Sequence, residues 1–215
     1  MTGSELLTLN FLLLGRTQSG KSAMANCLLG SYELESKLSA SSVTQECKLQ
    51  TACLSNFCRR NGSQLNLRIN VMDTPGCPHP TITKERLKQT VNTALQQHFH
   101  HGLHMALLVM RGDVPFCEED CQVIQFIKDL LGPEWNYHTT VIFSHEDRIT
   151  DAGFKNGQDY LRTAPDTLLE LLDSIQNKFH FVNYRADFLK EEQLQILNKL
   201  FYFIIHNGYK SLEFK

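Results

Sequence analysis

A glycine-bounded segment near the start of the chain has the residue types needed to hold phosphate groups. Residues 15–22 read Gly-Arg-Thr-Gln-Ser-Gly-Lys-Ser and fit the phosphate-loop pattern Gly-x-x-x-x-Gly-Lys-Ser/Thr. The glycines allow a tight turn whose backbone N–H groups point at phosphate oxygens. Lys21 is expected to reach the outer phosphates, and the Ser22 hydroxyl is expected to bind Mg²⁺. The alternative is a glycine-rich turn with a solvated lysine.

The sequence on either side of this segment favours the phosphate-binding interpretation. Phe11–Leu14 is an apolar run that predicts a buried strand, and Ala23–Leu29 predicts a helix. A strand, a loop and a helix in this order are the setting in which the motif works. The predicted nucleotide contacts in this segment are Gly15, Arg16, Thr17, Gln18, Ser19, Gly20, Lys21, Ser22 and Ala23.

A second candidate phosphate element is Asp73-Thr74-Pro75-Gly76. It follows residues 65–71, where apolar and polar residues alternate as in a half-buried strand. Asp73 is expected to hold Mg²⁺ through water, and the Gly76 N–H to touch the γ-phosphate. A plain Asp-Thr-Pro-Gly turn is the alternative. Thr44, which lies between the two motifs, is the candidate for a further Mg²⁺ ligand when a γ-phosphate is present.

The choice of base is expected to depend on Ser144-His145-Glu146-Asp147, which follows the predicted strand Thr139–Phe143. The Asp147 carboxylate matches the N1–H and amino donors of guanine. Against adenine it would be left unpaired, and an unpaired buried polar group is costly. By itself this short segment is a weak signal, and a solvated loop is the alternative.

The bulk properties exclude several classes of protein. The chain has 215 residues, a net charge of −2 and 42% hydrophobic residues. A general attraction to nucleic acid or to anionic membranes is not expected at this charge. The apolar runs are too short for a transmembrane segment, and Glu5 interrupts any secretory signal. The seven cysteines are therefore expected to be reduced thiols, and the expected location is the cytoplasm.

Two groups of residues invite a comparison with zinc sites. Cys117 and Cys121 are four positions apart, and four histidines crowd residues 98–104. Neither group has a partner pair at the spacing of a structural zinc site. The simpler interpretation of the histidines is a helix end with exposed imidazoles.

Strand-like and helix-like segments alternate along the chain. Strands are also predicted at residues 45–54, 105–110 and 179–182, and helices at 83–99, 118–131, 165–178 and 190–207. This order predicts an α/β fold: a three-layer P-loop NTPase of the Ras-like G-domain type, with helices on both faces of a mostly parallel sheet. Residues 45–54 would form its antiparallel edge strand. We expect one domain over residues 1–215.

At this point the chain resembles the GIMAP family, the immunity-associated nucleotide-binding proteins. The resemblance rests on residues 15–23, 34–47, 73–76, 106–120 and 139–147. It implies that GTP or GDP binds with Mg²⁺. It also implies that Ser36 contacts nucleotide, that His145 packs on the guanine beside Glu146 and Asp147, and that Asn183 borders the base. A homodimer through the nucleotide face is one arrangement it leaves open.

The chain departs from the family where the chemistry of hydrolysis is concerned. Asp113-Val114-Pro115 stands where the family has Leu-Gly-Arg, and Asn183-Tyr184 stands where it has Asn-Asn. Cys77 follows Gly76, so no glutamine positions water there. Arg111 is the nearest substitute for the missing arginine. A missing arginine finger costs roughly 10³ to 10⁵ in rate, so hydrolysis is expected on the order of 10⁻³ per second or below.

Three functions remain open from the sequence. The first is a guanine-nucleotide switch or scaffold that hydrolyses GTP slowly. The second is a pseudo-GTPase that serves as an interaction module without turnover. The third, an ATP-dependent phosphotransferase, is disfavoured because residues 151–162 offer only Lys155 and Arg162 for a lid over the transferred phosphate.

Overall fold

The computed structural model of the chain describes residues 5–31, 46–60, 63–183 and 189–214. Its centre is a six-stranded sheet with the order β2-β3-β1-β4-β5-β6. The strands are β1 (Glu5–Leu14), β2 (Lys48–Arg60), β3 (Ser63–Asp73), β4 (Met105–Arg111), β5 (Thr139–Ser144) and β6 (Phe179–Phe181). Edge strand β2 pairs antiparallel with β3, and the other neighbouring strands pair in parallel. The predicted mostly parallel sheet with one antiparallel edge strand is therefore confirmed.

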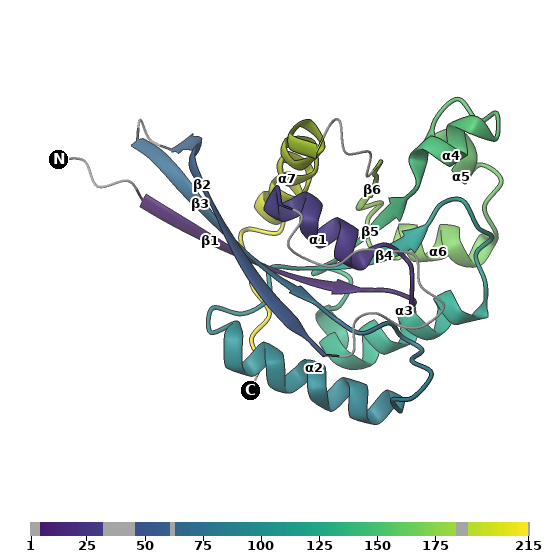
Figure 1. Cartoon of the computed structure of the whole chain (residues 1–215), viewed down its shortest axis with the longest axis horizontal. Coiled ribbons are helices and arrows are strands. Elements are labelled where there is room, and N and C mark those ends of the chain that lie inside the picture. The colour runs from purple at the N-terminus through teal and green to yellow at the C-terminus, as the bar shows by residue number, and fades with distance from the viewer. Residues whose placement is uncertain (1–4, 32–45, 61–62, 184–188, 215) are drawn as a thin grey trace.

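Helices cover both faces of this sheet (Figure 1). The helices are α1 (Lys21–Leu29), α2 (Lys84–His98), α3 (Glu118–Leu131), α4 (Glu146–Asp151), α5 (Gly157–Leu161), α6 (Asp166–Ser174) and α7 (Leu189–His206), with a short 3-10 turn at Gly132–Glu134. α1 and α7 pack on one face, while α2, α3 and α6 pack on the other. None of the helices in the described residues is both long and apolar enough to cross a membrane.

The central strand β1 shows why both faces must be covered. Leu9, Phe11 and Leu13 belong to the core under α1 and α7. Leu12 and Leu14 belong to the core under α2 and α3. All five are at most 1% exposed, because successive side chains of a strand point to opposite faces. A central parallel strand therefore needs a continuous apolar run, as this sequence has.

Several boundaries differ from the sequence-based predictions. Strand β2 continues to Arg60, with a shift in register between Leu54 and Cys58. The helix predicted over residues 165–178 ends at Ser174, because Gln176 and Asn177 adopt left-handed backbone conformations that a helix cannot contain. The short helices α4 and α5 were not predicted, since five or six residues carry too little periodicity.

Candidate nucleotide-binding site

The predicted phosphate loop connects β1 to α1 at the carboxyl edge of the parallel strands. Gly15 has φ +156°, and a Cβ there would collide with the carbonyl oxygen of Val109 on neighbouring β4. Gly20 caps α1 with φ +98°, and Gln18 also has a left-handed φ of 62°. The loop thus needs glycine for both close approach and backbone conformation. Residues 15–23 all lie between the end of β1 and the first turn of α1.

Lys21 lies under this loop rather than in solvent. Its Nζ donates to the carbonyl oxygens of Gly15, at 3.2 Å, and Arg16, at 2.7 Å. Burial lowers the pKa of Lys21 from 10.5 to about 8, against the opposing attraction of Asp73 and Cys77. A buried ammonium group whose acceptors are neutral carbonyl oxygens is expected to pair with an anion. The anion would raise the pKa of Lys21 again.

Ser22 and Asp73 lie together below the loop. The Ser22 hydroxyl donates to Asp73 Oδ2 at 2.7 Å, and burial raises the pKa of the Asp73 carboxyl. The other oxygen, Asp73 Oδ1, is buried and has no hydrogen-bond partner among the described residues. Thr17 Oγ1 and Ser19 Oγ are also buried without a hydrogen-bond partner among the described residues. Buried polar atoms are normally satisfied, so these oxygens indicate a site that the described residues alone do not complete.

The donor set at this point fits Mg²⁺. This cation takes oxygen ligands, keeps several waters and is commonly held by one or two protein groups together with substrate phosphates. Ser22 and Asp73 supply a hydroxyl and a carboxylate oxygen. Thr44, predicted as a further ligand, lies outside the described residues, as does Ser36. In the part of the chain that the structure describes, no group of three or more His, Cys, Asp or Glu side chains could hold a metal ion.

The segment after β3 packs directly on the phosphate loop. A Cβ on Gly76 would lie 2.5 Å from the backbone nitrogen of Thr17, so only glycine fits there. The Cys77 N–H donates to the Gly15 carbonyl oxygen at 3.0 Å, and the Thr74 hydroxyl donates to the Leu13 carbonyl oxygen at 2.7 Å. The two predicted phosphate motifs are therefore in direct contact, through packing and hydrogen bonds.

The predicted base-binding segment begins at the end of β5. The Ser144 hydroxyl is buried, and its single proton is shared between the carbonyl oxygens of Ser19, at 3.0 Å, and Met110, at 3.2 Å. Ser144 Oγ and His145 Nδ1 are 2.8 Å apart. Ser144 therefore ties this segment to the phosphate loop, a role that the sequence did not indicate. His145 adopts a left-handed φ of 64° and precedes α4, whose first turn carries Glu146 and Asp147.

The start of α4 meets the end of β6. The Glu146 N–H donates to the Val182 carbonyl oxygen at 3.2 Å. The Asn183 N–H donates to Glu192 Oε1 on α7 at 3.2 Å. Burial raises the pKa of Glu146 and of Glu192, and each is raised further by a neighbouring carboxylate, Asp147 and Glu146 respectively. Glu146, Asp147 and Asn183 thus lie close together, while Tyr184 lies outside the described residues.

Asp113 organises a charged cluster beside His145. It accepts hydrogen bonds from Arg111 Nε, at 2.9 Å, and Arg111 Nη2, at 2.7 Å. Arg148 Nη1 donates to it at 3.0 Å, and His145 Nδ1 lies 3.9 Å from it. These bonds lower the pKa of the Asp113 carboxyl. Arg111, the nearest substitute for a missing arginine, is therefore held by a carboxylate two residues away.

Arg16 links the phosphate loop to the start of α3. Its Nη2 lies 2.5 Å from Glu119 Oε2, and its Nη1 lies 3.5 Å from Asp120 Oδ2 and donates to Cys117 Sγ at 3.2 Å. Asp120 also accepts from the Cys117 N–H at 3.0 Å and so caps the helix. The acidic run Glu118–Asp120 was visible in the sequence, but nothing in it indicated the loop as its partner.

One expectation about the histidines was wrong. His98, His100 and His101 are exposed, but His104 is only 8% exposed. Its Nδ1 accepts a hydrogen bond from the Asn10 N–H at 3.1 Å. Burial is the main cause that lowers the pKa of His104, to about 4, so this ring is neutral and structural.

Comparisons with known proteins agree with this geometry. A model of the AIG1 family matches residues 9–208. Immune-associated nucleotide-binding protein 13 of Arabidopsis thaliana is 31% identical over 183 residues, which are 84% of this chain and 51% of that protein. GTPase IMAP family member 8 of Mus musculus is 29% identical over 90% of this chain and 26% of its own length. The chain spans about half, or less, of the curated relatives it matches.

Solved structures show the same fold at lower sequence identity. Toc33 from Arabidopsis thaliana, crystallised with GDP and Mg²⁺, is 18% identical and has a TM-score of 0.65, with 97% of this chain and 88% of that chain covered. Era from Aquifex aeolicus, bound to GDP and aluminium fluoride, is 20% identical with a TM-score of 0.59, and the match covers 91% of this chain and 56% of that chain. These likenesses confirm a P-loop GTPase fold. Since the family model spans most of the chain and agrees with the relatives, the chain belongs to the AIG1 family, as its resemblance to the GIMAP proteins implied.

Proposed function

We propose that this chain is a guanine-nucleotide-binding domain that takes GTP or GDP together with Mg²⁺ at the carboxyl edge of its sheet. The observation that carries the proposal is the arrangement of Lys21, Ser22 and Asp73, in which a buried ammonium and an unsatisfied carboxylate oxygen lie at one glycine-bounded loop. The names of the curated relatives, nucleotide-binding protein and GTPase, support it. So does the GDP and Mg²⁺ in the Toc33 structure.

The phosphates would lie over the loop. Backbone N–H groups of residues 15–23 and the helix N-terminus of α1 are suited to phosphate oxygens. Lys21 would exchange its two carbonyl acceptors for the outer phosphates. Ser22 and Asp73 would hold the cation, with Thr44 and the Gly76 N–H responding to a γ-phosphate. When bound, Mg²⁺ neutralises phosphate charge.

Guanine would lie between the ends of β5 and β6. Asp147 offers the carboxylate that pairs with guanine donors, and His145 offers a ring face held by Ser144 on one side. Glu146 and Asn183 would border the base, and Ser36 would approach the nucleotide from the segment before β2. Asp113 would keep the neighbouring arginines, Arg111 and Arg148, paired and away from the base.

We propose that hydrolysis of GTP by this chain is slow or absent. Arg111 is bound bidentately to Asp113, and Pro115 has no charge to offer. Cys77 carries no amide to orient water. These three residues also favour a second candidate function, a nucleotide-bound interaction module that does not hydrolyse GTP. A homodimer through the nucleotide face, a cytoplasmic location and a single domain over residues 1–215 belong to the same proposal. For Toc33, a solved structure with this fold, dimerisation is described as important for GTPase activity.

The binding proposal is tested by titrating the nucleotide-free protein with fluorescent GDP in the presence of Mg²⁺, with ATP as the competitor. Guanine recognition predicts that unlabelled GDP displaces the probe and that ATP at equal concentration does not. Displacement by ATP would show that the base assignment is wrong. No binding of either nucleotide would overturn the proposal.

The two candidate functions are separated by single-turnover hydrolysis of GTP at increasing protein concentration. A rate that rises with protein concentration would favour the slow, dimer-assisted GTPase. Binding without hydrolysis at all concentrations would favour the interaction module.

A further inference from the structure

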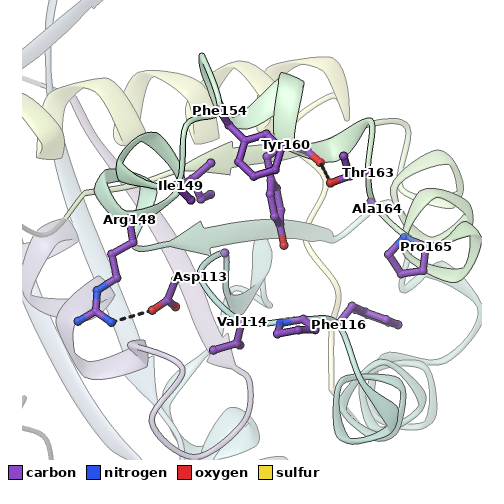
Figure 2. A pocket seen from close by; sticks show the side chains of 13 residues that line it. Asp113, Val114, Phe116, Arg148, Ile149, Phe154, Tyr160, Thr163, Ala164 and Pro165 are labelled. Atoms are coloured by element: carbon purple, nitrogen blue, oxygen red, sulfur yellow. Dashed lines mark hydrogen bonds and ion pairs between the residues drawn. The ribbon is translucent and has the colours of Figure 1, made fainter.

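A cavity lies beside the candidate nucleotide site, and none of the residues that line it is a predicted nucleotide contact. Figure 2 shows this cavity between the segment after β4 and the helices α4 and α5. Its volume is about 590 Å³, within the range of about 300–1,000 Å³ typical of small-molecule sites. The lining residues are Gly112, Asp113, Val114, Pro115, Phe116, Arg148, Ile149, Ala152, Phe154, Tyr160, Thr163, Ala164 and Pro165.

The walls of this cavity are apolar and built from packed rings. Phe154 and Tyr160 meet edge to face with ring centroids 5.5 Å apart, and Tyr160 meets Phe181 in the same way at 6.5 Å. Gly157 allows this arrangement, since a Cβ there would lie 2.5 Å from Phe181 Cγ. The Tyr160 hydroxyl points into the cavity toward the segment that carries Val114 and Phe116 (Figure 2). The aromatic wall is therefore fixed by its own packing.

One end of the cavity carries its two charged lining residues. Asp113 has a side chain only 7% exposed, and it is already paired with Arg111 as well as with Arg148. Arg148 is 59% exposed, and its Nη1 donates to Asp113. Two guanidinium groups thus share one buried carboxylate. The accessible charge at this end is positive, and it belongs to Arg148.

We infer that this cavity is a second ligand site, for a small amphipathic anion whose aromatic or aliphatic body lies among Val114, Phe154 and Tyr160 and whose acidic group pairs with Arg148. A cationic ligand would find the Asp113 carboxylate already neutralised. A neutral apolar ligand would leave uncompensated the net positive charge of two guanidinium groups that share one carboxylate. None of its lining residues is a predicted nucleotide contact, so the ligand and the nucleotide would not compete for the same side chains.

The test uses two fluorescent probes of the same shape on the whole folded chain. Anilinonaphthalene sulfonate carries the acid, and N-phenyl-naphthylamine is its uncharged analogue. We expect saturable binding of the sulfonate at one site per chain, retained when GDP is saturating. No binding to the folded protein, or loss of binding on addition of GDP, would overturn the inference.

Matched variants locate the probe. Arg148→Gln should weaken binding of the sulfonate about threefold to tenfold, as expected for a partly exposed charged hydrogen bond, and leave the neutral analogue unchanged. Arg162→Gln, in an arginine whose side chain is 82% exposed and outside the cavity, is the control and should change neither. Equal effects of the two arginine variants would refute the role of Arg148.

Filling the cavity gives an independent check. Val114→Trp should abolish binding of both probes, whereas Leu194→Trp, which adds the same ring on the exposed part of α7, should not. Ala152→Trp, at an exposed rim residue, repeats the test should the Val114 variant lose its cooperative thermal unfolding. Probe binding that survives in a folded filled variant would place it elsewhere and contradict the inference.

Discussion

The buried lysine of the phosphate loop makes the stability of the nucleotide-free protein depend on pH. Lys21 is 6% exposed, and burial lowers its pKa from 10.5 to about 8. Below pH 8 both the folded and the unfolded protein carry the charge, so the folded state bears the full cost of burying it. Between pH 8 and 10.5 the folded state has lost the proton while the unfolded state keeps it. Stability therefore rises with pH in this window.

The size of this effect follows from the two pKa values. A difference from 10.5 to about 8 corresponds to roughly 3 kcal/mol, since one pKa unit is about 1.4 kcal/mol. Lys21→Met removes the titrating group and keeps most of the aliphatic chain. The free energy of unfolding of the wild type, relative to that of this variant, is expected to increase by about 2–3 kcal/mol from pH 7 to pH 10.

A second buried lysine provides the control. Lys178 is 7% exposed, and its Nζ donates to the carbonyl oxygens of Asn136, at 2.7 Å, and Tyr137, at 2.8 Å. Burial also lowers the pKa of Lys178 from 10.5 to about 8. The difference in the free energy of unfolding between the wild type and Lys178→Met should depend on pH in a similar way. Only Lys21→Met should weaken GDP binding, by roughly tenfold to a hundredfold for a lost charged hydrogen bond.

The assay is urea unfolding of the nucleotide-free proteins at pH 7, 8, 9 and 10, with GDP affinity measured separately at pH 7. Nucleotide must be removed first, because any ligand of the folded state adds its own stabilisation. Taking the difference between wild type and variant cancels the titrating groups that do not interact with Lys21; Asp73 and Cys77 do interact with it. A difference between wild type and Lys21→Met that stays constant with pH would refute the reasoning. Equal loss of GDP affinity in both lysine variants would refute the site.

Three further substitutions examine the other parts of the site. Gly76→Ala should destabilise the protein by about 1–3 kcal/mol in urea unfolding, because its Cβ would lie 2.5 Å from the Thr17 nitrogen. Asp73→Asn should reduce the apparent Mg²⁺ affinity of the GDP complex at least roughly tenfold in a Mg²⁺ titration, because a charged ligand is lost. Asp147→Asn should weaken GDP binding roughly tenfold to a hundredfold and leave binding of pyrophosphate unchanged in a competition titration.

Two of these substitutions, Gly76→Ala and Asp147→Asn, have a control close by. Gly112→Ala places a Cβ 2.6 Å from Ile149 Cδ1, the movable end of a side chain, and 3.1 Å from the Ser144 carbonyl oxygen. It should cost less than Gly76→Ala, whose Cβ meets backbone atoms of Thr17 at 2.5 and 2.7 Å. Asp151→Asn, in an exposed residue of the same helix as Asp147, should leave GDP affinity unchanged. Equal effects in the glycine pair would show that the backbone contact with Thr17 does not matter. Equal effects in the aspartate pair would argue against Asp147 as the partner of the base.

The sequence by itself determined the features that are local in the chain. The phosphate loop could be predicted because its glycines, Lys21 and Ser22 are contiguous and carry their own backbone geometry. The alternation of residues 65–71 correctly predicted β3, and the helix predicted over residues 118–131 agrees with α3. The fold class followed from the order of these elements, since parallel strands joined by helices have few arrangements.

Only the tertiary structure decided which distant residues meet. Arg16 and Cys117 are 101 positions apart, and Ser144 and Ser19 are 125 apart, yet each pair is joined by a hydrogen bond. The placement of β1 between β3 and β4 brings these segments to the same edge. Burial of a polar side chain is likewise a property of packing, so the lowered pKa of Lys178 could not be read from its neighbours in sequence. Periodicity reports the face of an element on which a residue lies, but the partner on that face is set by the order of the strands.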